Sequence, residues 1–275
     1  ELYLVLLDWE EAFDKVDRKQ LFISMERMGV NQKLINLTKS LYRETKFCVE
    51  IDGYTSEWLP QSTGIRQGCP LSPYLFLIVM TTMFHDVHHI MDRKLINHRV
   101  PGADFDEVTY ADDTICISKD IKAMNKFIET IEKEGIKYGM KLNKKKCELI
   151  TKNQNANIHF PDTTPVKKQS SATYLGCEMG IKLHNRQEIS KRFAATMATM
   201  KKLDLFWRHS DCPTHVKVHV ADAVLRSKLL YGLESAQLIP SVLKKLETFQ
   251  LKVLRTILKI YTTYINRVNT NAGIF

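Results

Sequence analysis

The N-terminal part of the chain alternates between short apolar runs and segments with helical periodicity. Residues 2–7 form a continuous apolar run that ends at Asp8, as in a central strand covered on both faces. Residues 107–118 alternate apolar and polar positions around Tyr110–Asp113, which predicts two half-buried strands joined by a tight turn. Strands and helices that alternate around an antiparallel hairpin predict an α+β fold.

Further elements are expected between and after these segments. Asp17 can cap a helix that Gly29 ends, and Asp52-Gly53 is a turn signal that predicts a hairpin formed by residues 47–51 and 54–59. The remaining periodic segments predict helices at residues 31–42, 72–90 and 121–138 and a returning strand at residues 148–151.

Beyond Gly180 the pattern becomes helical. Helices are predicted at residues 189–207, 213–234 and 240–261, and three helices of this length can pack as a small bundle. The expected organisation is therefore a first domain, residues 1–180, that contains an antiparallel sheet with packed helices, followed by an all-helical domain, residues 181–275.

The charge of the chain favours a polyanionic partner. The sequence has 40 Lys and Arg against 31 Asp and Glu, a formal net charge of +9. Basic residues of the predicted helical domain either contact nucleic-acid phosphates or simply solvate exposed helix faces, and the sequence leaves both interpretations open. These residues include Lys191, Arg192, Lys201, Lys202, Lys217, Arg226, Lys228, Lys244, Lys245, Lys252 and Arg255.

Composition argues against a membrane-spanning protein and against a disulfide-stabilised one. The longest apolar run, residues 74–84, is shorter than the ~20 residues that a membrane-spanning helix needs, so no membrane partner is expected. The six cysteines include no Cys-x-x-Cys pair, and three lie in apolar, strand-like surroundings, which favours free thiols in a reducing compartment.

Three carboxylates fall at strand ends. Asp112 and Asp113 occupy the tight turn, and Asp8 follows the first apolar strand. Adjacent carboxylates resist joint ionisation away from water, and a bound divalent cation would offset that cost. Such a triad could hold two Mg²⁺ ions for in-line phosphoryl transfer, whereas Asp112-Asp113 alone is also compatible with an ordinary turn.

Five segments, in this order, resemble motifs A to E of reverse transcriptases: Leu7–Asp14, Gly64–Phe76, Tyr110–Asp113, Gly139–Lys146 and Tyr174–Cys177. The second and third are most similar to non-LTR (LINE-type) retrotransposons, with group II intron enzymes as near relatives. Residues 229–235 and 246–258 resemble the helical thumb of LINE-type enzymes. The resemblance implies a palm over residues 1–180 and a thumb over residues 181–275. The family's fingers segment, which precedes motif A, is expected to be missing, so the chain is expected to be a fragment or a decayed copy.

The implied function is RNA-directed DNA polymerisation, in which a primer 3′-hydroxyl attacks the α-phosphate of a dNTP. The resemblance implies two Mg²⁺ ions, with Mn²⁺ as an alternative, and an RNA template, a DNA primer and dNTP as partners. It also implies an intracellular, nuclear location. Nothing in the sequence indicates the oligomeric state.

The same resemblance assigns roles to individual residues. Asp8, Asp112 and Asp113 are the expected catalytic metal ligands, and Lys146 is the expected general acid for the departing pyrophosphate. Phe13 would lie beneath the sugar and exclude a 2′-hydroxyl, which favours deoxynucleotides. The implied nucleotide-binding residues are Glu11, Ala12, Phe13, Gln67 and Gly68, and the implied primer grip is Tyr174, Leu175 and Gly176.

Other interpretations remain open. Phe13 could simply pack in the core, and any of the three consecutive lysines at residues 144–146 could be a solvated loop residue. The chain could also be a catalytically incomplete remnant that acts only as an RNA or RNA/DNA binding module. A third alternative is an RNA polymerase with a similar palm, against which Phe13 argues.

Overall fold

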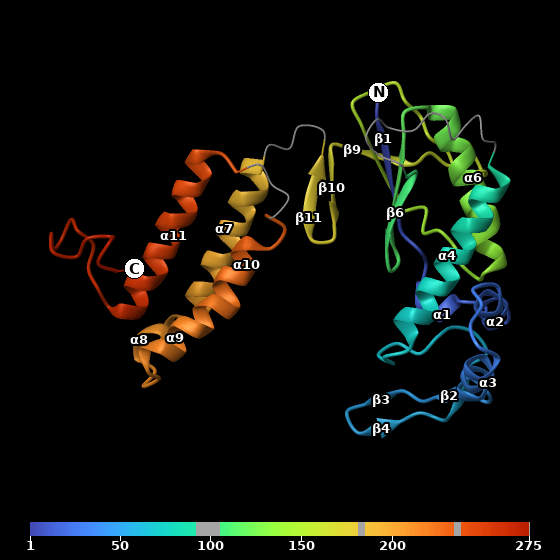
Figure 1. Cartoon of the computed structure of the whole chain (residues 1–275), viewed down its shortest axis with the longest axis horizontal. Helices are drawn as coiled ribbons and strands as arrows, with labels where there is room; N and C mark the ends of the chain where they lie inside the picture. The colour runs from blue at the N-terminus through green and yellow to red at the C-terminus, as the bar shows by residue number, and fades with distance from the viewer. Residues whose placement is uncertain (92–104, 181–184, 234–237, 275) are drawn as a thin grey trace. The chain divides into compact units, whose positions relative to one another are not determined.

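The computed structural model describes residues 1–91, 105–180, 185–233 and 238–274, with the backbone alone for residues 185–187. The chain forms two compact units, Glu1–Ala172 and Thr173–Phe275, which are described separately (Figure 1). The division falls after Ala172, whereas the sequence-based boundary was placed after Gly180. Within the described ranges, every helix is too short or too polar to cross a bilayer.

The first unit is built on a five-stranded sheet of order β6-β7-β1-β8-β9 (Figure 1). The central strand β1 (Tyr3–Leu7) pairs antiparallel with β7 (Asp113–Ser118) on one side and with β8 (Glu148–Thr151) on the other. β6 (Glu107–Tyr110) extends the sheet beyond β7, and β9 (Lys167–Gln169) pairs parallel with β8. The first strand, the turn strands and the returning strand are therefore confirmed. β9 was not predicted, because its polar sequence carries no strand pattern.

Helices cover this sheet and contribute most of its core. α4 and α6 pack against each other, α6 also contacts β7, and α2 packs against α4 (Figure 1). The predicted cap of α2 is confirmed, since the Asp17 side chain accepts a hydrogen bond from the Gln20 amide. Val5, Phe76 and Ile128 lie fully buried in one continuous apolar core. The helices are α1 (Ala12–Lys15), α2 (Arg18–Arg27), α3 (Gln32–Leu41), α4 (Ser72–Ile90) and α6 (Ile121–Lys137).

The predicted hairpin before α4 forms, but its strands are interrupted. Two short pairs make it up, β2 (Lys46–Phe47) with β5 (Leu59–Pro60) and β3 (Glu50–Ile51) with β4 (Tyr54–Thr55). Between the two pairs, the Ser56 hydroxyl accepts a hydrogen bond from the Val49 amide at 2.9 Å. A side chain therefore replaces the backbone acceptor of a regular ladder.

The second unit consists of a short hairpin and a group of helices, as the all-helical expectation largely predicted. The hairpin is formed by β10 (Ser171–Tyr174), of which Thr173 and Tyr174 belong to the second unit, and β11 (Cys177–Gly180). The first expected helix is divided at Leu203, and the second contains a π-helical turn. The second helix ends at Leu230, before the expected end at residue 234, which itself lies outside the described residues. The helices are α7 (Asn185–Lys202), α8 (Asp204–His209), α9 (Thr214–Val220), the π-helix η1 (Ala221–Arg226), α10 (Ser227–Leu230) and α11 (Pro240–Leu258).

Trp207 anchors the packing of the second unit. Its side chain is fully buried, and its indole N–H donates to the Met200 carbonyl at 3.0 Å. Lys217 is also buried and donates to the carbonyls of Trp207 and Ser210, at 3.1 and 2.9 Å. Lys217 therefore fits neither alternative left open by the sequence, phosphate contact or solvation of an exposed helix face, because its ammonium is buried and satisfies carbonyls at the end of α8.

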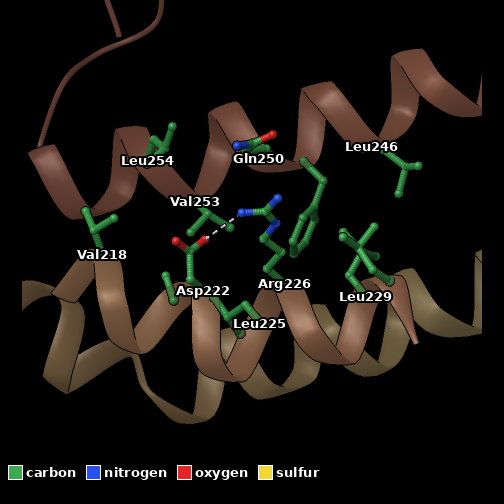
Figure 2. A pocket seen from close by; sticks show the side chains of 12 residues that line it. Val218, Asp222, Leu225, Arg226, Leu229, Leu246, Gln250, Val253 and Leu254 are labelled. Carbon is green, nitrogen blue, oxygen red and sulfur yellow. Dashed lines mark ion pairs between the residues drawn. The ribbon is translucent and has the colours of Figure 1, made fainter. Parts of the chain in front are cut away.

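A cavity of about 170 Å³ lies between η1–α10 and α11 (Figure 2). Leu225, Leu229 and Val253 line it, while Asp222 and Arg226 project from η1 and form an ion pair at 3.7 Å. Both charged side chains are more than half exposed, so this pair contributes little to stability.

Candidate active site

The register of the sheet brings Asp8 next to Asp113. Leu7 pairs with Thr114 at the end of the antiparallel β1–β7 ladder, and Asp8 and Asp113 are the residues that adjoin this last pair. The charge of Asp8 acts on Asp113, as expected for carboxylates that lie close together. Tyr110 pairs with Asp113 across the β6–β7 hairpin, which leaves Ala111 and Asp112 as the turn residues. The expectation that both acids occupy the turn is therefore wrong for Asp113, which is the first residue of β7. Three carboxylates therefore lie at one end of two neighbouring strands.

The turn that presents Asp112 is strained. Ala111 has a φ of 52°, in the left-handed region that favours glycine. An alanine in this conformation costs about 1–2 kcal/mol. The flanking strand pairs hold it there because a two-residue hairpin turn requires positive φ.

The electrostatics of these acids favour a bound cation. Burial raises the pKa of Asp113, and the neighbouring charges of Asp112 and Asp8 raise it further. The Oδ1 atom of Asp8 is buried and accepts no hydrogen bond, and the Lys146 ammonium lies 3.8 Å from it. Carboxylate oxygens are the ligands that hard divalent cations prefer. The chemistry of this donor set fits such ions. No group of three metal-ligating side chains among the described residues already stands at ligand spacing.

An open cleft of about 700 Å³ in the first unit collects most of the predicted site residues. It is formed by segments that are far apart in the sequence: the end of β1, the loop before α4, the β6–β7 turn and the loop before β8. The predicted residues that line it are Asp8, Glu11, Ala12, Phe13, Gln67, Gly68, Asp112 and Lys146. Asp113 adjoins the cleft through its pairing with Tyr110, next to Asp112.

Phe13 forms one wall of the cleft. Its ring stacks on the buried ring of Phe76, with centroids 4.5 Å apart and planes 12° apart. This contact holds the Phe13 ring in one orientation, because stacked aromatic pairs contribute about 0.5–1.5 kcal/mol of stability beyond their buried area. The ring is only partly buried and also lines the cleft. Phe13 therefore packs on the core and also lines the cleft, while its role in excluding a 2′-hydroxyl stays a prediction.

Arg18 connects the segments that carry Phe13 and Gln67, and the sequence reasoning missed it. Its guanidinium donates to the carbonyls of Gly64, Gln61 and Thr63 at 2.8, 2.7 and 3.0 Å. The Gly64 and Ile65 amides in turn donate to the carbonyls of Val16 and Phe13, both at 2.8 Å. Since its acceptors are mostly backbone carbonyls, no side-chain pattern in the sequence could have identified it.

Gln67 is held by an acid of the preceding segment. Its amide nitrogen donates to Asp14 Oδ2 at 2.8 Å. Gly68 has a φ of 79°, and a Cβ there would meet nothing within 4 Å. The loop therefore requires glycine at residue 68 for its backbone conformation rather than for space.

The three consecutive lysines differ in their surroundings. Lys144 pairs with Glu132 and Asp162, each at 2.7 Å, and is a structural residue. Lys145 is exposed, whereas Lys146 lines the cleft with its ammonium near Asp8. Of the three, Lys146 is thus the one beside the carboxylates.

The predicted primer-grip residues lie in the second unit. Leu175 and Gly176 form the turn between β10 and β11, with φ of 48° and 72°. Two successive left-handed residues are typical of a two-residue hairpin turn.

The chain belongs to the family described as reverse transcriptase (RNA-dependent DNA polymerase), which its residues 1–179 match. The RNA-directed DNA polymerase from the mobile element jockey of Drosophila melanogaster is 25% identical over 275 aligned positions, covering 91% of this chain and 28% of that protein. The Pol polyprotein from the retrotransposable element R2 of Nasonia vitripennis is 26% identical over 149 residues, covering 54% of this chain and 14% of that protein. The non-LTR reverse transcriptase resemblance seen in the five motifs is confirmed.

A solved structure supports the fold. Apo telomerase from Candida tropicalis matches 93% of this chain and 46% of that chain, with a TM-score of 0.52 and 15% sequence identity. At this identity the likeness concerns the fold alone. The chain spans less than a third of the length of the two relatives above, at 28% and 14%.

Proposed function

We propose that this chain is the polymerising part of a non-LTR retroelement enzyme that copies RNA into DNA. In this reaction a DNA primer's 3′-hydroxyl attacks the α-phosphate of a dNTP on an RNA template. The observation that carries the proposal is the cleft of the first unit, in which Asp8, Phe13, Gln67, Asp112 and Lys146 meet from separate segments.

Asp8, Asp112 and Asp113 would hold two divalent cations, Mg²⁺ or Mn²⁺. When bound, the cations would lower the pKa of the attacking hydroxyl and neutralise the leaving pyrophosphate. The carboxylates are suited to this role because Asp113 is destabilised by its neighbours' charges and Asp8 has a buried oxygen that accepts no hydrogen bond.

The other residues of the cleft position the nucleotide and protonate the leaving pyrophosphate. The Phe13 ring, supported by Phe76, blocks the space beside the sugar C2′ and so excludes ribonucleotides. Gln67 and Gly68 would lie over the nascent base pair, and Glu11 and Ala12 would present backbone amides to the triphosphate. The Lys146 ammonium donates a proton towards the leaving pyrophosphate oxygen.

In this proposal the first unit is the palm and the second the thumb. The β10–β11 turn, Tyr174–Gly176, serves as the primer grip, and exposed basic residues such as Lys244 and Lys245 contact the duplex backbone. Binding to backbone phosphates predicts an affinity that falls with salt, by about 0.9 in log K per log salt for each phosphate contacted on B-DNA.

Primer extension on an RNA template tests the proposal. Asp112→Asn should lower the rate of nucleotide addition at least about a hundredfold, because several kcal/mol of charge stabilisation are lost. Its melting temperature should change little, since Asp112 is exposed. Asp52→Asn is the matched control, an exposed aspartate in the turn of the β3–β4 hairpin.

Retention of activity within a few-fold in Asp112→Asn would refute the metal-ligand assignment. A wild-type chain that binds primer–template tightly, yet extends no primer with either Mg²⁺ or Mn²⁺, would instead support a binding module.

A further inference from the structure

Tyr231 lies directly against the β10–β11 turn. It follows α10 and belongs to the segment that resembles the LINE-type thumb. Its hydroxyl donates a hydrogen bond to the Leu175 carbonyl at 3.0 Å. A Cβ on Gly176 would lie only 3.4 Å from Cε1 of the Tyr231 ring, so the ring contacts both turn residues.

Arg192 of α7 binds the same turn. Its Nη2 donates to the Gly176 carbonyl at 2.7 Å and to Cys177 Sγ at 3.5 Å, while its Nε donates to Glu188 at 2.6 Å. The guanidinium carbon lies 4.9 Å from the centre of the Tyr231 ring. Only 14% of the Arg192 side chain is exposed, so these charged hydrogen bonds are shielded from water. Both carbonyls of the turn are thus bound by side chains of the helical segments.

Gly232 permits this close approach. Its φ is 72°, and a Cβ at this position would lie 2.3 Å from Cys177 Sγ. A side chain at residue 232 would therefore force the Cys177 thiol out of its present position, and its positive φ would be strained for any residue other than glycine. On the hairpin side, Glu178 pairs with Lys191 of α7, which adds a second attachment to that helix.

The turn itself needs support. Leu175 has a φ of 48°, which a leucine rarely adopts. Its side chain is 37% exposed, whereas its carbonyl is bound to Tyr231. The helical segments therefore fix the backbone of the turn and leave the Leu175 side chain accessible.

We infer that Tyr231, Arg192 and Gly232 are positioning residues that hold the Leu175–Gly176 turn in the conformation that aligns the primer 3′ end. This inference rests on the proposed function, in which that turn is the primer grip. Duplex affinity comes mainly from contacts to phosphates, so loss of these bonds should disturb the alignment of the primer end more than its binding.

A photo-cross-link tests the inference without requiring catalysis. The probe is an RNA template annealed to a DNA primer that ends in 5-iodo-deoxyuridine, and mass spectrometry measures its cross-link yield to residues 174–176. The affinity of each variant for the same duplex is measured in parallel. Tyr231→Phe keeps the ring and removes one hydrogen bond, and Arg192→Gln removes the guanidinium.

Tyr231→Phe should lower the cross-link yield at the turn roughly fivefold, the effect of one ordinary hydrogen bond. Arg192→Gln should lower it at least as much, because it removes charged hydrogen bonds. Duplex affinity should change less than twofold. Tyr264→Phe is the matched control, because Tyr264 is 97% exposed in the same unit. Melting curves of the full chain establish that each variant is folded.

The outcomes separate the inference from the function on which it rests. No cross-link to the turn in the wild-type chain would refute the primer-grip assignment and the inference with it. A wild-type cross-link that both variants retain within twofold would leave the primer grip standing and overturn the positioning role. An equal loss of affinity and cross-link would show that Tyr231 and Arg192 serve binding alone, which also overturns it.

Discussion

Gly64 is a position where a single added methyl group should clearly damage the first unit. Its φ is 76°, and a Cβ there would lie 2.4 Å from the carbonyl oxygen of Asp14 and 2.7 Å from the Asp14 Cα. These are backbone atoms, so no side chain can rotate away to make room. Gly64→Ala must therefore separate the loop before α4 from the segment that carries Phe13.

The expected loss can be worked out from the contacts at this point. A left-handed alanine costs about 1–2 kcal/mol. Separation also weakens the bonds from the Gly64 amide to Val16 and from Arg18 to the Gly64 carbonyl, both 2.8 Å, at about 0.5–1.5 kcal/mol each. The reduced entropy of the unfolded chain returns about 0.4–1 kcal/mol. Gly64→Ala should thus destabilise the first unit by about 2–4 kcal/mol.

Gly68→Ala is the matched control. Gly68 has a similar φ of 79°, but a Cβ there would meet nothing within 4 Å, so only the conformational cost applies. Its expected destabilisation is about 1 kcal/mol or less after the entropy gain. Urea unfolding, followed by hydrogen exchange of peptides from β1, reports the first unit alone. Equal destabilisation by both substitutions, within about 0.5 kcal/mol, would refute the steric reasoning.

Three further predictions concern the lysines and the cleft. Lys144→Ala should destabilise the first unit at neutral pH. The hydrogen bond from Lys144, together with those from Thr164, lowers the pKa of Asp162 to about 2. The stability gained from the Lys144–Asp162 pair is present above the ordinary pKa of 3.8 and is lost as the pH falls towards 2, so the urea midpoints of wild type and variant should converge in acid. Lys146→Ala should slow single-turnover nucleotide addition by roughly 10²–10⁴-fold, and an unchanged rate would exclude it as the general acid. Phe13→Ala should lower the preference for dNTP over rNTP at least about tenfold in competition assays, and an unaltered preference would leave Phe13 with packing alone.

The sheet and its carboxylates could be predicted because local patterns determine them. The apolar run of β1 and the alternation of β6 and β7 are period signals, and the two-residue turn fixes which residues face each other. Once Tyr110 pairs with Asp113, the position of Asp112 follows, whereas the position of Asp8 follows only from the pairing of β1 with β7.

Elements held by long-range backbone contacts could not be predicted in this way. β9 joins the sheet through parallel pairing with β8, although its sequence, Lys167–Gln169, is polar. The contacts that attach the β10–β11 turn to Tyr231 and Arg192 use carbonyl groups, which every residue possesses. Sequence patterns reflect only the types of side chain, so contacts made by backbone carbonyls cannot be predicted from them.

The lysines at residues 144–146 show why site residues are harder to predict than strands. The three side chains are identical and adjacent, and the acids around them decide their roles. Glu132 and Asp162 form ion pairs with Lys144, whereas the ammonium of Lys146 lies beside Asp8. These acids lie on α6, in the loop before β9 and at the end of β1, so only the folded chain brings them to the same loop. It follows that Glu132→Gln combined with Asp162→Asn would free a second ammonium in this loop while leaving the pair between Lys146 and Asp8 in place.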